Sequence, residues 1–178
     1  MSAKSPLAST VRRGRHPLVD LLSGLATGEG FGPTCLPDVR LMRSTETHPS
    51  SPVSYDPSIV IIAQGCKRGR LGSRTFTYDA QNYLVLAVPL PFECETIGTP
   101  AEPLLGMAVR VNPATVAELL LEQDAAPLPA AGSPPAVAST PLTPELSDAA
   151  VRLAMCLRSP VEARILGPQI IREMTYRA

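Results

Sequence analysis

The stretch that decides the fold is residues 55–111, YDPSIVIIAQGCKRGRLGSRTFTYDAQNYLVLAVPLPFECETIGTPAEPLLGMAVRV. Short runs of Ile, Val, Leu, Phe and Tyr alternate there with Gly, Pro, Asn and Asp. This alternation is typical of short antiparallel strands joined by turns. The stretch therefore predicts a compact β unit at the centre of the chain.

Within this unit, residues 59–63 are apolar at every position, which favours a strand covered on both faces. Gly72 and Ser73 separate two strand-like runs and predict a two-residue hairpin loop. About seven short strands of this kind favour a small barrel or a jelly roll. The runs that predict strands are residues 39–44, 59–63, 74–78, 83–88, 92–97 and 104–111.

The flanking segments differ in composition from the β unit. Residues 17–26 place Leu at helical spacing after a first-turn Pro, and the run TGEGFGPT predicts the end of that helix. Residues 47–58 hold three prolines and predict a loop or an irregular edge segment. Helical spacing returns at residues 115–122, 144–157 and 160–177, with a break or kink expected at Gly167-Pro168.

These segments predict four parts along the chain. Residues 1–15 form a disordered tail, and residues 16–123 form the barrel with its flanking helices. Residues 124–143, rich in Ala, Pro and Ser, form an extended linker. Residues 144–178 form a helical segment. The fold class is therefore mainly β with C-terminal α.

Composition narrows the function classes. The 178 residues contain 16 Lys and Arg against 16 Asp and Glu, so the net charge is zero and no basic surface for nucleic acid is indicated. The four cysteines are far apart and predict reduced, buried thiols. No apolar run is long enough for a membrane helix or a signal peptide, and we expect a cytoplasmic protein.

No catalytic constellation is present. Glu93 and Glu95 share a strand face, but neither His16 nor His48 accompanies them as a partner for acid–base work or metal binding. We therefore predict no catalytic residue, no metal site and no cofactor. The basic hairpin formed by Lys67, Arg68, Arg70 and Arg74 has two interpretations, a grip for an anionic ligand or a charged tip that keeps an edge strand soluble.

The chain resembles the N-terminal domain of the AraC-type transcriptional regulators. The text that carries the resemblance includes LPDVRLMRS, the central stretch from YDPSIVIIAQGCKRGR to PFECET, and EPLLGMAVRVNP. SPVEARILGPQIIREMTYR resembles the helical stretch that precedes the family's DNA-binding half. These segments are residues 36–44, 55–96, 102–113 and 159–177.

The resemblance implies a cupin-like barrel, a jelly roll or double-stranded β-helix, that senses an effector and dimerises. In the family two helix-turn-helix units follow this region; the present residues do not contain them, so we expect this polypeptide alone not to read DNA. The expected partners are an unknown small-molecule effector and a second copy of the chain, with DNA bound only through the missing part. Two alternatives stay open: a metal-free structural dimerisation module and a small-molecule enzyme of the cupin type.

Polar or adaptable side chains on the predicted strands are the candidates for lining an effector pocket. Alternation alone does not say which strand face points inward. The apolar stripes of the last two helices are core or, as the alternative, a dimer seam. The candidate pocket residues are Met42, Gln64, Tyr83, Cys94, Met107 and Arg110, and the candidate seam residues are Leu146, Leu153, Leu157 and Ile170.

Overall fold

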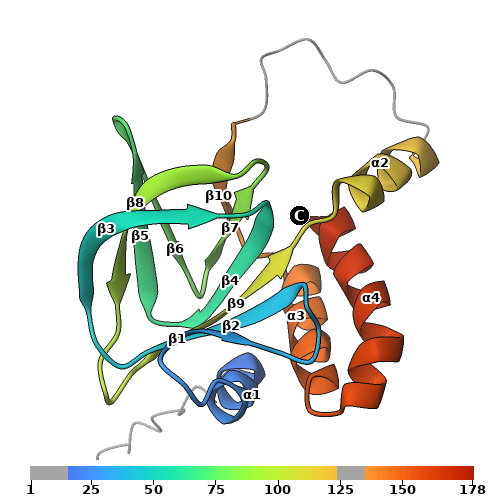
Figure 1. Cartoon of the computed structure of the whole chain (residues 1–178), viewed down its shortest axis with the longest axis horizontal. Coiled ribbons are helices and arrows are strands. Elements are labelled where there is room, and N and C mark those ends of the chain that lie inside the picture. Colours follow the sequence, from blue (N-terminus) through green and yellow to red (C-terminus); the bar gives the residue numbers. More distant parts are fainter. Residues whose placement is uncertain (1–15, 124–134) are drawn as a thin grey trace, which may run out of the picture.

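The computed structural model describes residues 16–123 and 135–178. Their strands form two antiparallel sheets that face each other as a barrel, and helices cover one side of it (Figure 1). The strands are β1 (Gly30–Pro33), β2 (Val39–Ser44), β3 (His48–Tyr55), β4 (Ser58–Gln64), β5 (Cys66–Leu71), β6 (Arg74–Asp79), β7 (Asn82–Leu86), β8 (Leu90–Ile97), β9 (Leu104–Arg110) and β10 (Val137–Pro141).

The strand order is that of a jelly roll. One sheet has the order β1-β2-β9-β4-β7-β10 and the other β3-β8-β5-β6. Successive strands from β2 to β6 alternate between the two sheets or turn back in a hairpin, as expected for paired Greek keys. The predicted fold class, mainly β with a cupin-like barrel and C-terminal helices, is confirmed.

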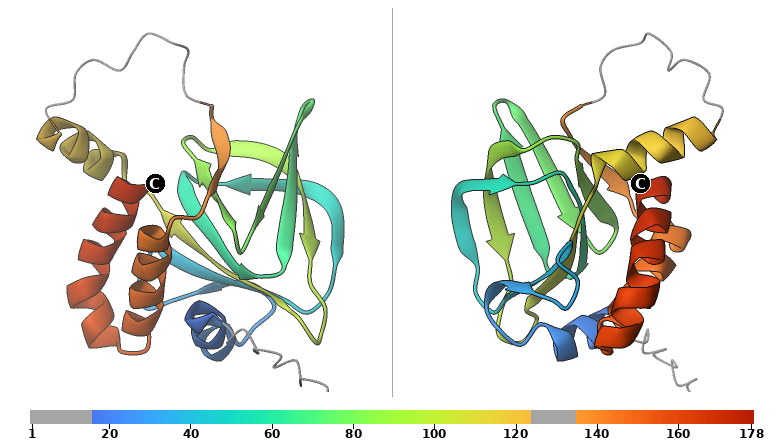
Figure 2. Two further views of the ribbon diagram at one scale, coloured as in Figure 1. Left: turned by 180° about the vertical axis from the view of Figure 1, so that it is seen from behind. Right: turned by 45° about the vertical axis from the view of Figure 1, so that its right-hand side comes forward.

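The helices are α1 (Pro17–Leu25), α2 (Pro113–Glu122), α3 (Pro144–Cys156) and α4 (Pro160–Arg177). Helices α1, α3 and α4 form a layer against the six-stranded sheet (Figure 2). Helix α3 contacts both α1 and α4, and α1 also contacts β4 and β9. Helix α2 has no buried residue and is connected to α4 by ion pairs from Arg172 to Glu118 and Glu122.

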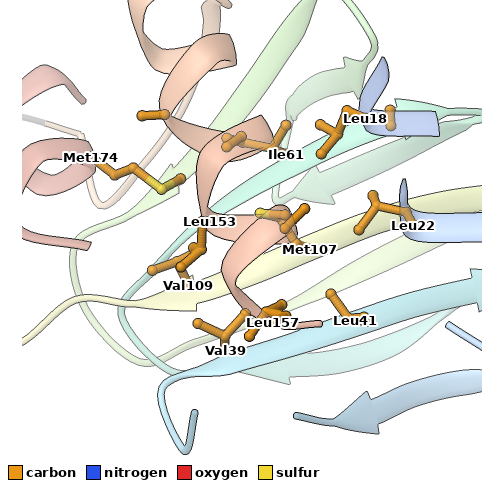
Figure 3. Packing of buried hydrophobic residues seen from close by; sticks show 14 of the residues in the cluster. Leu18, Leu22, Val39, Leu41, Ile61, Met107, Val109, Leu153, Leu157 and Met174 are labelled. Carbon is orange, nitrogen blue, oxygen red and sulfur yellow. The ribbon is translucent and has the colours of Figure 1, made fainter. Parts of the chain in front are cut away.

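The six-stranded sheet is a wall shared by two apolar cores. Along β4, Ile59 and Ile61 point to the helices, whereas Val60 and Ile62 point into the barrel. This division follows from the two-residue period of a strand, and it explains why β4 is apolar at every position from 59 to 63. On the helix side, Val39, Leu41, Met107 and Val109 meet Leu18, Leu22, Leu153, Leu157 and Met174 (Figure 3).

Three edge strands depart from the sequence-based expectation. Residues 48–55 were predicted as loop but form β3, and residues 137–141 of the predicted linker form β10, which pairs with β7. Residues 30–33 of the Gly-rich run form β1. Each of these strands is the outermost of its sheet, where one side needs no hydrogen-bond partner and prolines are tolerated. The predicted tail and residues 124–134 lie outside the described residues.

Two local signals elsewhere gave the expected structures, whereas a third, in the last helix, did not divide that helix. Gly72 has a positive φ of 59° between the paired residues Leu71 and Arg74, as the two-residue hairpin requires. The Thr143 hydroxyl accepts from the backbone N–H of Leu146 and caps α3. The predicted interruption at Gly167-Pro168 does not divide α4, which is assigned as one helix through both residues.

Candidate functional site

The barrel interior is lined by aromatic as well as aliphatic side chains. Phe31, Tyr55 and Phe92 form a chain of edge-to-face contacts with ring centroids 5.6 and 5.4 Å apart. Phe76 continues this chain, 5.4 Å from Phe92 and stacked on Tyr78 at 6.3 Å. The sequence has only seven Phe and Tyr residues in total, counted as 3 Phe and 4 Tyr, and five of them meet here. Aromatic rings in contact with one another therefore make up much of the barrel interior.

Three polar side chains lie within this aromatic lining. The Tyr78 hydroxyl and the Cys94 thiol share a hydrogen bond of 3.2 Å. The Tyr55 hydroxyl is buried next to them and, among the described residues, forms no hydrogen bond of normal geometry, although Tyr78 and Cys94 lie close enough to affect its pKa. Burial raises the pKa of Tyr55 and of Tyr78, so both hydroxyls are neutral at ordinary pH. An unsatisfied buried hydroxyl is uncommon in folded proteins, so the Tyr55 hydroxyl requires an explanation such as a bound water or ligand atom.

Lys67 brings a cationic group to the same interior. Its side chain is only 6% exposed, and within the described residues its ammonium forms no ion pair or hydrogen bond. The Nζ atom lies 5.7 Å from the centre of the Phe31 ring, a cation–π contact. Burial lowers the pKa of Lys67, with Cys94 opposing the shift. Lys67 is thus an unusual buried group whose charge nothing in the described chain neutralises.

A cleft leads from the surface to this cluster. It has a volume of about 320 Å³, and Phe31 and Tyr55 form part of its wall. Arg40 and Arg110 also line it, and the Arg40 guanidinium lies 5.1 Å from the centre of the Phe31 ring. Phe31 therefore contacts both the cleft and Lys67, and it belongs to the short edge strand β1.

The remaining hairpin cations point away from the interior. Arg68 pairs with Glu95 at 3.4 Å, and Arg70 pairs with Glu93 across β5 and β8. The two carboxylates are therefore used in exposed cross-strand pairs. Lys67 shares the inward face of β5 with Gly69 and Leu71, and this common parity is the signal in the sequence that sets it apart from Arg68 and Arg70.

The six candidate pocket residues do not form one site. Met42 and Cys94 lie in the barrel core, whereas Tyr83 and Met107 lie in the core that faces the helices. The Tyr83 hydroxyl donates to the Ala178 carbonyl at 3.1 Å. At the barrel ends, Gln64 donates to the Pro103 carbonyl and Arg110 pairs with Asp38 at the cleft. Met42, Cys94 and Arg110 thus lie at or near the barrel site. Phe31, Tyr55 and Tyr78 were not among the candidates, and Lys67 was considered only as one of the four cations of the basic hairpin.

The four candidate seam residues are all part of the intrachain core. Leu146 and Leu153 are completely buried, and Leu157 and Ile170 are each 7% exposed. These side chains pack against α1 and the six-stranded sheet, as Leu153 and Leu157 show in Figure 3. A dimer contact through these four residues would require the helical layer to leave the barrel.

The described residues form neither a metal-binding cluster nor a membrane-spanning helix. Across residues 16–123 and 135–178, His, Cys, Asp and Glu side chains do not gather in groups of three that could hold a metal ion. Over the same residues, no helix combines the length and the apolar character needed to cross a membrane.

A family model described as the AraC-type transcriptional regulator N-terminus matches residues 35–178. The match covers both sheets from β2 onward and the helices α2, α3 and α4. No curated protein matched the chain.

Two solved structures of ToxT from Vibrio cholerae strain SCE256 are similar to the chain. The apo form of a ToxT variant shares 10% sequence identity with a TM-score of 0.48, over 85% of this chain and 59% of that one. Wild-type ToxT with a bound unsaturated fatty acid shares 13% identity with a TM-score of 0.47, over 78% of this chain and 50% of that one. The chain therefore spans 50–59% of the length of these proteins.

Proposed function

The chain belongs to the AraC-type transcriptional regulators as part of their N-terminal region, and on this premise we propose that its barrel binds a small-molecule effector and transmits the bound state to its helices. The barrel acts as a sensor and catalyses no reaction. In the whole protein, a helix-turn-helix region outside residues 1–178 binds DNA. The regulator works in the cytoplasm, where its promoter DNA is found.

The proposal rests on the six-stranded sheet, because one of its faces lines the barrel interior and the other packs against the helices. Neighbouring residues of β9, Leu104 and Leu105, belong to the barrel core and to the helix-side core respectively. A ligand that moves the barrel face of β9 or β4 therefore changes the surface on which α1 and α3 pack. Close-packed cores transmit such small shifts because they tolerate little empty space.

The coupling extends to the end of α4. The Tyr83 hydroxyl on β7 donates to the Ala178 carbonyl, and the adjacent residue Leu84 points into the barrel. Strand β7 thus contacts both the barrel interior and Ala178, the residue that follows α4. An effector shifts the balance between two arrangements of the helices only if it binds one arrangement more tightly than the other.

Hydrogen exchange with and without effector tests this function. A panel of small metabolites is first screened for compounds that raise the melting temperature. For such a compound we expect slower amide exchange in β4, β5 and β8 and a change in α3 or α4. Protection confined to the barrel, with α3 and α4 unchanged, would refute the transmission of the signal; the lack of any stabilising compound would refute sensing.

We also propose that the regulator is a homodimer and that the outer surface of α3 and α4 forms the contact. Met155, Val161, Ile165 and Leu166 are between 46% and 62% exposed on neighbouring parts of these helices. Val161 and Ile165 are one helical turn apart and lie on the same face. Exposed apolar residues on one face are a feature of protein contact surfaces. This surface replaces the buried stripe that the sequence analysis selected.

Ile165→Glu should abolish the dimer, because it places a charge in the middle of the apolar contact. Sedimentation equilibrium of the purified chain measures the effect. The matched control is Leu121→Glu on α2, where the side chain is 81% exposed. Equal dimer dissociation constants for the two variants would contradict the proposed surface.

A second function, a structural dimerisation module without an effector, is favoured by the filling of the barrel. Tyr78, Ile62, Leu84, Leu86 and Leu104 are all almost completely buried there. Under this alternative the melting temperature responds to no metabolite, whereas Ile165→Glu still dissociates the dimer. The metabolite screen and the dimer measurement together separate the two functions.

A further inference from the structure

Lys67 is the feature of the barrel that packing does not explain. A buried ammonium costs free energy unless an anion or several hydrogen bonds compensate for it. Within the described residues, no such partner is present, although the side chain is only 6% exposed. Its position on β5 is fixed by register, because Lys67 is opposite Tyr78 on β6 and Thr96 on β8, which are also buried. Lys67 thus places a largely buried cation in the barrel without a counter-charge from the described residues.

The groups around Lys67 suit a carboxylate. The Tyr55 hydroxyl is buried without a partner and is available as a donor. Phe31 connects the two groups, since its ring lies 5.6 Å from the Tyr55 ring and 5.7 Å from Nζ of Lys67. One ammonium and one hydroxyl match one negative charge and its oxygen atoms. A dianion such as a phosphate monoester would bring a second charge that nothing there neutralises.

On this basis we propose that the effector is an organic monocarboxylate with an apolar or aromatic body, whose carboxylate pairs with Lys67 and Tyr55 inside the barrel. This proposal rests on the proposed function, because it names the chemical class that the barrel senses. The body of the ligand packs on Phe76 and Phe92, the aromatic side chains next to the polar cluster. Neutral ligands would leave the Lys67 charge without a partner.

The entrance is the cleft beside β1. Phe31 and Tyr55 line both the cleft and the polar cluster, so a ligand that enters there reaches Lys67 when the Phe31 ring turns aside. Strand β1 pairs with β2 alone, and Gly30, with φ of 79°, begins it. Arg40 and Arg110 line the rim together with Asp38 and Asp56, so the formal charges at the entrance balance. Arg110 pairs with Asp38, and the selection for an anion therefore rests on Lys67 inside and not on the rim.

The test compares carboxylates with their neutral amides. Calorimetric titrations of the intact chain use sodium benzoate, phenylacetate, octanoate and oleate, and the amide of each compound in parallel. We expect at least one carboxylate to bind and its amide to bind at least about tenfold more weakly, because a charge-assisted hydrogen bond is lost. Equal binding of acid and amide, or binding by none of the four acids, would overturn the proposal.

Variants locate the anion. Lys67→Met keeps the length and apolar stem of the side chain, so the variant should fold and melt no lower than the wild type, and it should bind the carboxylate at least about tenfold more weakly. Tyr55→Phe should weaken binding by a smaller factor. The control is Arg68→Met, one residue along β5, which removes an exposed cation and should leave affinity unchanged. Undiminished carboxylate affinity in Lys67→Met would overturn the proposal.

The same measurements separate this proposal from the function on which it rests. If neutral metabolites slow exchange in the barrel and alter α3 or α4 while carboxylates do not, the barrel is a sensor for another chemical class and only the anion proposal fails. If carboxylates bind at Lys67 but leave the helices unchanged, the site stands and the transmission fails.

Discussion

The two faces of the six-stranded sheet are formed by the same strands but differ in the side chains that they bury. The helix-side core is aliphatic apart from Tyr83, whose hydroxyl has a partner in Ala178. The barrel-side core holds most of the aromatic rings of the chain, the unpartnered Tyr55 hydroxyl and the uncompensated ammonium of Lys67. The same strands contribute to both, so the difference arises from the side chains and not from the backbone.

The comparison indicates how stability and binding are divided. Aliphatic side chains that fill space completely maximise the free energy of unfolding. Polar groups left without partners lower it and are retained where a ligand supplies what is missing. We therefore expect substitutions on the helix side to destabilise the fold, and removal of the polar groups on the barrel side to cost binding but not stability.

The largest loss in the free energy of unfolding should come from Leu153→Ala. Leu153 is completely buried between α3 and the sheet, so its truncation leaves a cavity against Val109 and its neighbours (Figure 3). Such truncations lower the free energy of unfolding by about 2–5 kcal/mol. Urea denaturation followed by circular dichroism measures the change. On α2, Leu121→Ala alters a side chain that is 81% exposed and should change stability by less than about 0.5 kcal/mol.

This pair of variants also tests the position of the helical layer. If α3 were free to leave the barrel, Leu153 would be exposed and both truncations would have similar, small effects. Equal unfolding free energies for Leu153→Ala and Leu121→Ala would therefore contradict the difference between the two faces.

Parts of this comparison could be predicted from the sequence, and parts could not. The apolar run of β4 correctly indicated a strand covered on both faces, because every buried position must satisfy one core or the other. The face on which a strand residue lies depends on register, and the sequence does not determine register for β9. Met107 was for this reason placed in the pocket although it faces the helices.

The strands that were missed share a physical cause. The edge strand β3 is mostly exposed, with Ser and Pro where a central strand has apolar residues, so its sequence carries little hydrophobic signal. Partner strands supply the order that its own residues do not. For the site, the basic hairpin drew attention to four cations together, and only the alternation along β5 distinguishes Lys67 from Arg68 and Arg70.

The second effect, intermediate in size, concerns the stability of Lys67→Met as a function of pH. Burial lowers the pKa of Lys67 below its ordinary value of 10.5. Between the two pKa values the unfolded chain binds the extra proton, so the unfolding free energy of the wild type rises with pH in that window. The variant lacks this contribution. We expect it to be more stable than the wild type by about 1 kcal/mol near neutral pH, with the difference shrinking as the pH rises.

Urea denaturation of both proteins from about pH 7 up to the ordinary lysine pKa of 10.5 measures this difference. Tyr55 and Tyr78, whose pKa values burial raises, are present in both proteins, so the comparison largely removes their contributions. A variant less stable than the wild type throughout this range would show that the ammonium has a partner in the fold.

The smallest effect should distinguish two tyrosines, one on each face. Tyr83→Phe removes the hydrogen bond to the Ala178 carbonyl and should lower the free energy of unfolding by about 0.5 kcal/mol, with faster amide exchange in the last turn of α4. Tyr55→Phe removes a hydroxyl that has no partner, and it should leave stability unchanged or slightly higher while it weakens the binding of a carboxylate. Thermal unfolding, hydrogen exchange and calorimetric titration of both variants complete the comparison. If Tyr55→Phe destabilises the fold as much as Tyr83→Phe, the Tyr55 hydroxyl already has a partner, and the barrel face is a packed core like the face opposite.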